Sequence, residues 1–96
     1  MTSKERSELK SIAMTQPAIL SIGKDSVSDE FITACEEALE ARELIKLNVL
    51  KNCDDDIKEM AVQLAEETDS EVVQIIGRKI VLYRMARKPE NRKIRL

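Results

Sequence analysis

One short segment carries the residue types and spacing that could hold a phosphate group. Residues 21–31, S-I-G-K-D-S-V-S-D-E-F, predict a strand end, a turn at Gly23-Lys24 and a helix capped by Ser28. Such a turn can present backbone N–H groups and a lysine ammonium to phosphate oxygens. The Walker A spacing is absent. An ordinary strand-to-helix turn remains the alternative, and Asp25 favours it because a carboxylate repels a phosphate.

Few other residues offer catalytic chemistry. The chain has no histidine and no tryptophan, which excludes Ser-His and Cys-His catalysis and histidine metal sites. The run Asp54-Asp55-Asp56 lacks the spacing and glycine of a calcium loop and is interpreted as helix capping and solvation. Cys35 falls on an apolar helix stripe and Cys53 near a helix start, and both are interpreted as structural thiols. We expect no catalytic residue, metal, cofactor or small-molecule substrate.

Charge is distributed unevenly along the 96 residues. The total is 16 basic and 18 acidic residues, a net charge of −2. Residues 84–96 hold six basic residues and one acid, so their net charge is +5 and that of residues 1–83 is −7. A basic end can bind a polyanion even when the total charge is negative, although charged tails also keep small proteins soluble.

Hydrophobic periodicity places seven elements before residue 84. Thr2 and Glu5 match a capping box, and the two residues Gly77-Arg78 between β-rich runs suit a type II′ hairpin. The expected order is helix–strand–helix–strand–helix–strand–strand. The expected elements are helices over 3–14, from 29 onward and from 57 to about 68, and strands over 18–22, 44–50, 72–76 and 79–83.

This order predicts an α+β fold, in which a four-stranded mixed sheet carries three helices mainly on one face. Residues 1–84 form a single domain and residues 85–96 a basic, mobile tail. No apolar run approaches the roughly 18–20 residues of a membrane span, and the polar N-terminus lacks a signal peptide. We therefore expect a cytoplasmic protein.

Three segments together resemble the CRM domain (chloroplast RNA splicing and ribosome maturation), whose free-standing bacterial members are the YhbY-like proteins. They are S-I-G-K (21–24), A-L-E-A-R-E-L-I-K-L-N-V-L (38–50) and E-V-V-Q-I-I-G-R-K-I-V-L-Y-R (71–84). The resemblance runs from about residue 2 to residue 84. It implies an RNA-binding domain of the same topology, associated in bacteria with precursors of the large ribosomal subunit.

The family loop is G-x-x-G, comparable to the backbone-clamping loop of KH domains. In this chain Gly23 and Lys24 match, but Ser26 stands where the second glycine would be. If that position needs a left-handed backbone, serine costs about 1–2 kcal/mol there.

RNA recognition without base stacking fits this composition, because Phe31 and Tyr83 are the only aromatic residues. Phosphates and ribose would be contacted by cations and backbone amides. The candidate RNA-binding residues are Gly23, Lys24, Lys4, Arg6, Lys10, Arg78, Lys79 and Arg84. The sequence thus predicts a monomeric, non-catalytic protein that binds ribosomal RNA during large-subunit assembly and has no membrane association. The alternative is a protein-interaction module whose acidic helices bind a basic ribosomal protein or assembly factor.

Overall fold

A computed structural model describes residues 1–96. Three helices and four strands follow one another in the predicted order, which confirms the α+β class. The helices are α1 (Ser3–Met14), α2 (Asp29–Arg42) and α3 (Ile57–Thr68), the strands are β1 (Leu20–Ile22), β2 (Leu44–Val49), β3 (Glu71–Ile76) and β4 (Lys79–Tyr83), and a single 3-10 turn, η1, spans Pro89–Asn91.

Side-chain caps fix where the helices begin. The Thr2 hydroxyl accepts from the N–H of Glu5 while the Glu5 carboxylate accepts from the N–H of Thr2, so the predicted capping box is confirmed. Ser28 caps α2 as predicted. Asp56 caps α3 by accepting from the N–H of Glu59, which assigns a capping role to one carboxylate of the 54–56 run.

The sheet has the strand order β1-β2-β4-β3. β1 runs parallel to β2, and β4 is antiparallel to both β2 and β3. Gly77 has a φ of +56° and Arg78 has no positive φ, which fits the predicted type II′ turn and excludes type I′. A bulge interrupts the β3–β4 register between Val72 and Gln74.

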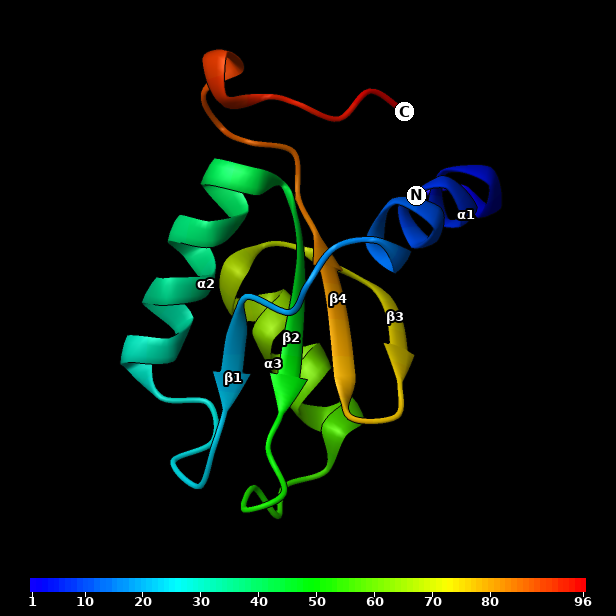
Figure 1. Cartoon of the computed structure of the whole chain (residues 1–96). Helices are drawn as coiled ribbons and strands as arrows, with labels where there is room; N and C mark the ends of the chain where they lie inside the picture. The colour runs from blue at the N-terminus through cyan, green and yellow to red at the C-terminus, as the bar shows by residue number, and fades with distance from the viewer.

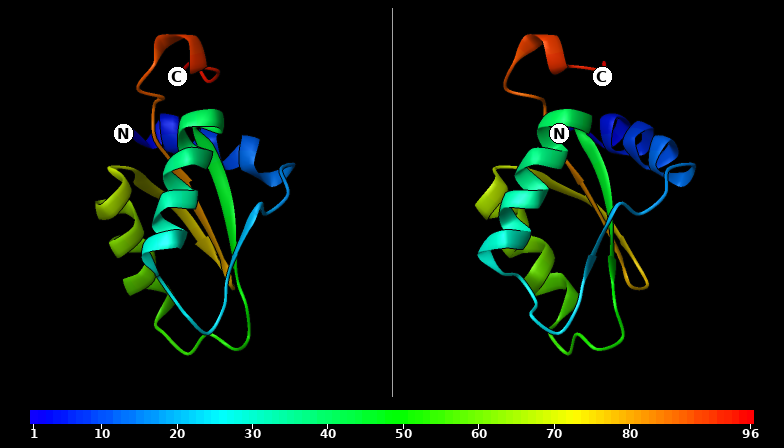
Figure 2. Two further views of the ribbon diagram at one scale, coloured as in Figure 1. Left: turned by 90° about the vertical axis from the view of Figure 1, so that its left-hand side faces the viewer. Right: turned by 60° about the vertical axis from the view of Figure 1, so that its left-hand side comes forward.

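The larger part of the core lies between the sheet and the pair α2 and α3, which cover one face (Figures 1 and 2). Strand alternation places Ile45 and Leu47 of β2 and Leu82 of β4 in this layer. Val81 belongs to the opposite face. Two of the three helices therefore cover one face, which agrees with the prediction that the helices lie mainly on one face.

Helix α1 lies on the other face (Figure 2). Its buried residues Leu9 and Ala13 form a smaller cluster with four sheet residues, namely Leu44, Val73, Val81 and Tyr83. The guanidinium of Arg6 donates to the carbonyls of Val72 and Val73 at 2.7 and 2.9 Å. The remainder of that face is open and polar, with Lys46, Asn48 and Gln74 partly exposed.

Residues 85–96, called the strap below, leave β4, pass the C-terminal end of α2 and turn toward α1 (Figure 1). Carboxylates of α2 and of its C-cap accept hydrogen bonds from the strap backbone. The mobility expected for these residues stays a prediction. Hydrogen bonds from the strap backbone oppose such mobility. No helix combines the length and the apolar character that crossing a membrane requires.

Candidate nucleic-acid interface

Three connections meet at one end of the molecule, below the sheet in Figure 1. They are the β1–α2 loop (residues 23–28), the β2–α3 loop (residues 50–56) and the hairpin turn (residues 77–78). We call this group the loop end. It brings together Gly23, Lys24 and Arg78, and Lys79 follows directly as the first residue of β4. These four are half of the residues predicted from the sequence.

The turn from Gly23 to Ser26 is closed by a hydrogen bond from the N–H of Ser26 to the carbonyl of Gly23 at 3.0 Å. Lys24 and Asp25 occupy its exposed tip, and their N–H groups donate to no acceptor within the protein. An exposed lysine beside two unused backbone donors is an arrangement that can contact a phosphate.

Ser26 adopts the left-handed backbone conformation, with a φ of +53°. Its hydroxyl hydrogen-bonds to the carboxylate of Asp55 in the neighbouring loop, which helps to hold this conformation. Gly23 does not have a positive φ, and a Cβ added there would meet Asn52 Oδ1 at an ordinary 3.6 Å. The position that favours a second glycine is therefore occupied by a serine without loss of the left-handed geometry.

Arg78 links two of the three connections. Its Nε donates to the carbonyl of Val49 at 2.9 Å, and one terminal nitrogen donates to the carbonyl of Leu50 at 2.7 Å and of Cys53 at 3.3 Å. The guanidinium thus orders the loop end and has few donors left for a ligand. Lys79 is exposed and its Nζ lies 3.4 Å from Asn48 Oδ1.

The open face of the sheet adjoins this end through Lys79. Lys46, Gln74 and Lys79 line a small hollow there, together with the exposed apolar side chains of Met14 and Ile76. Lys46 is not among the residues predicted from the sequence, although its alternation with buried neighbours places it on the polar face. Lys51, which is exposed in the β2–α3 loop, is also not among the predicted residues. Its position just after a predicted strand could have indicated a place in a loop at the end of the sheet.

The other predicted residues lie away from the loop end. Lys4 is exposed and Lys10 half-buried on α1, whereas Arg6 is engaged with β3. Arg84 is only 7% exposed. It pairs with Glu36 at 2.9 Å and Glu40 at 3.6 Å, so we leave it out of the loop-end surface.

Acidic residues moderate the charge of the loop end. Asp55 is bonded to Ser26 and Asp56 caps α3, while Asp25 and Asp54 are exposed. No group of three or more carboxylate, thiol or imidazole side chains is close enough together to hold a metal ion. Burial, with a smaller contribution from Glu36, raises the pKa of Cys35 to about 12, so this thiol is not a nucleophile at neutral pH.

A family model, the CRS1 / YhbY (CRM) domain, matches residues 1–84. The chain belongs to the CRM domain family. The resemblance drawn from the three sequence segments is thereby confirmed.

Two of the similar proteins match nearly the whole chain, the strap included. The Bacillus subtilis protein named probable RNA-binding protein YqeI is 43% identical over 96 residues, which is 100% of this chain and 98% of the relative. A probable RNA-binding protein of Pseudomonas aeruginosa is 27% identical over 93% of this chain and 86% of its own length. The solution structure of a hypothetical protein from Staphylococcus aureus superposes with a TM-score of 0.79, at 40% identity and with 99% of each chain covered.

Proposed function

We propose that this CRM domain protein binds RNA without catalysing a reaction, and that its target is ribosomal RNA in an assembling large subunit in the bacterial cytoplasm. The observation that carries the proposal is the turn at residues 23–26, which keeps a left-handed residue and presents Lys24 with two unused N–H donors. Family membership and the names of the relatives support it.

Binding at this site is electrostatic and directed at the RNA backbone. Lys24 and Lys79 supply exposed cations, and Lys46 and Lys51 extend the same region along the sheet face and the neighbouring loop. Neither aromatic residue of the chain lies in the three connections, so recognition rests on phosphates and ribose rather than on stacked bases.

The contacts of α2 weaken the alternative hypothesis, in which acidic helices bind a basic partner protein. The carboxylates of Glu36, Glu40 and Glu43 are engaged inside the molecule with Arg84, Arg87 and backbone N–H groups of the strap. They are therefore poorly available for a basic partner protein.

The test is a salt titration of binding to large-subunit ribosomal RNA. Lys24→Ala should weaken binding several-fold and lower the slope of log K against log salt by about one unit, because one phosphate contact is lost. Lys58→Ala is the matched control, since it removes the same charge from an exposed position on α3 outside the three connections. Equal effects of the two variants would show that net charge, not the turn, governs binding.

A second arm of the test uses Asp25, the exposed carboxylate at the tip of the turn. Asp25→Asn should strengthen RNA binding several-fold, because a repulsive charge beside the phosphate is removed. Competition between ribosomal and unrelated RNA of equal length then tests the target. Equal affinity for both would contradict the ribosomal assignment while leaving RNA binding in place.

A further inference from the structure

The strap is held to the molecule mainly through its backbone N–H groups, which donate to carboxylates of α2 and of its C-cap. Glu40 accepts hydrogen bonds from the N–H of Arg87 at 2.8 Å, from the N–H of Lys88 at 3.2 Å and from the side-chain amide of Asn91 at 2.8 Å. Glu43, which is fully buried, accepts from three further N–H groups. Those three belong to Ala86, Lys93 and Ile94.

Because backbone groups satisfy these carboxylates, most strap cations remain without an acidic partner. Arg87 makes the one ion pair of the strap, with Glu36 at 3.1 Å. Four exposed basic side chains of the strap have no carboxylate within 4.0 Å, and the exposed Arg42 at the end of α2 has none either. The four are Lys88, Arg92, Lys93 and Arg95.

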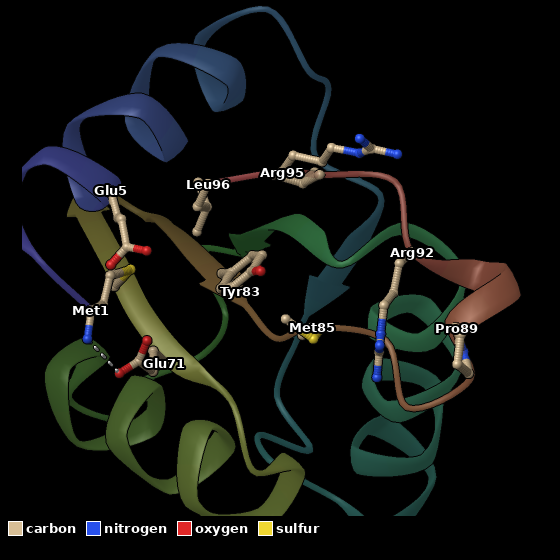
Figure 3. Close-up of a pocket in the computed structure, with 10 residues that line it drawn as sticks. Met1, Glu5, Glu71, Tyr83, Met85, Pro89, Arg92, Arg95 and Leu96 are labelled. Atoms are coloured by element: carbon tan, nitrogen blue, oxygen red, sulfur yellow. Dashed lines mark ion pairs between the residues drawn. The ribbon is translucent and has the colours of Figure 1, made fainter.

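Four of these five cations, all but Lys88, border two hollows. Arg42 and Lys93 line one hollow beside the C-terminal half of α1. Arg92 and Arg95 border another, in which Tyr83 lies between the strap and the start of α1 (Figure 3). The acids across that hollow are engaged, since Glu5 belongs to the capping box and Glu71 lies 3.8 Å from the N-terminal amine.

We propose that this strap end is a second surface for an RNA phosphate backbone, so that one molecule holds two RNA segments, one at each end. The inference rests on the proposed function of the loop end. A set of cations outside any ion pair, on a segment that the fold holds in place and beside Glu40 and Glu43 whose carboxylates are already engaged, complements a polyanion. The loop end and the strap lie at opposite ends of the molecule in Figure 1, and its longest dimension is 36 Å. The CRM family model ends at residue 84, so all of these cations except Arg42 lie outside the matched residues.

The experiment measures stoichiometry and bridging with a short hairpin of ribosomal RNA, in two batches that carry a donor and an acceptor dye. The hairpin is chosen shorter than the protein. The unaltered protein should bind two hairpins and give energy transfer between them. The variant Lys88→Gln/Arg92→Gln/Lys93→Gln/Arg95→Gln should bind one hairpin, through the loop end, and give none. Lys24→Ala/Lys79→Ala should also bind one hairpin, through the strap end.

A matched control distinguishes binding to an ordered strap surface from non-specific attraction by net positive charge. Glu43→Gln makes the protein one unit more positive while weakening the hold on the strap, and Glu40→Gln does the same at a half-buried position. A fixed surface predicts several-fold weaker binding of the second hairpin, whereas simple attraction by charge predicts stronger binding. Circular dichroism checks the fold, and Glu40→Gln serves alone if Glu43→Gln does not fold.

The results separate this inference from the proposed function. If the strap variant still binds two hairpins and bridges them, the second surface is overturned, and the loop end stands provided that Lys24→Ala weakens binding. Stronger binding by Glu43→Gln or Glu40→Gln also overturns it. If neither the strap variant nor Lys24→Ala changes binding, both the inference and the proposed function fail.

Discussion

The loop end and the strap end both carry cations, but their backbones are fixed by opposite means. At the loop end a cation orders the chain, because the guanidinium of Arg78 binds three carbonyls. At the strap end anions order it, because Glu40 and Glu43 bind backbone N–H groups. An arginine used for structure is lost to RNA, whereas a glutamate used for structure leaves neighbouring cations available. Sequence charge alone therefore overstates one basic region and understates the other.

The largest expected effect comes from removing the anion that orders the strap. Glu43→Ala leaves three N–H donors without their acceptor and should lower the free energy of unfolding by about 3 kcal/mol. Urea unfolding measures it. Glu43 also has a φ of +67°, so Glu43→Gly should be about 1 kcal/mol more stable than Glu43→Ala. A loss well below 1 kcal/mol in the alanine variant would mean that the strap does not depend on this carboxylate.

The corresponding change at the loop end is Arg78→Ala. It removes the charged donor to Val49, Leu50 and Cys53 from a partly exposed position and should cost about 2 kcal/mol in the free energy of unfolding. Amide exchange in the β2–α3 loop should accelerate in the same variant, because that loop loses its tie to the hairpin. Lys79→Ala, at the next residue, is the control and should leave both quantities nearly unchanged. If it has the same effect as Arg78→Ala, the carbonyl contacts are not the cause.

A smaller effect is expected at Ser26, where backbone strain and a side-chain contact oppose each other. Ser26→Ala keeps the positive φ and loses the bond to Asp55, whereas Ser26→Gly loses the bond but relieves the strain. The glycine variant should be about 1 kcal/mol more stable than the alanine variant, as measured by urea unfolding. The reverse order would indicate that the turn does not need its left-handed residue.

The smallest effect concerns pH at the strap end. The side-chain amide of Asn91, followed by the N–H groups of Arg87 and Lys88, lowers the pKa of Glu40 from 4.5 to about 2. Since the folded-state pKa is depressed, its stabilising contribution is full above about pH 4.5 and is lost as the pH falls toward about 2. The amide resonances of Arg87 and Lys88 should therefore stay constant down to about pH 4 and shift below it. A midpoint near 4.5, or the same shift in Glu40→Gln, would contradict this assignment.

The pKa of the neighbouring Glu43 is also lowered, although burial opposes this shift more strongly than it does at Glu40. Burial alone would raise its pKa, but hydrogen bonds from Ala86, Lys93 and Ile94 hold the pKa below its usual value. Both carboxylates that hold the strap, Glu40 and Glu43, therefore lose their stabilising contribution as the pH falls.

Local patterns were enough to predict the order of the three helices and four strands. The capping box at Thr2, the alternation in 44–50 and the two-residue hairpin loop all depend on residues a few positions apart, and each is confirmed. The face covered by α1 depends instead on tertiary packing. An amphipathic helix shows that it needs a partner, but not which side of the sheet provides it.

The candidate site was predictable to a smaller degree for the same reason. The Gly23-Lys24 turn carries a local signature, whereas the burial of Arg84 depends on Glu36, which lies 48 residues away. The hold of Glu40 and Glu43 on the strap likewise joins residues more than 40 positions apart through backbone groups. Backbone donors are identical in every residue except proline, so no side-chain pattern marks such contacts in advance.

The contact between Arg6 and β3 has a consequence for self-association. β3 is an outer strand of the sheet, and an outer strand offers unpaired carbonyls on which a second chain could add as a further strand. Arg6 occupies the carbonyls of Val72 and Val73 beside the bulge, so this stretch of the border presents a charged side chain where an approaching strand would need free acceptors. The first helix thereby blocks strand addition along this stretch of β3.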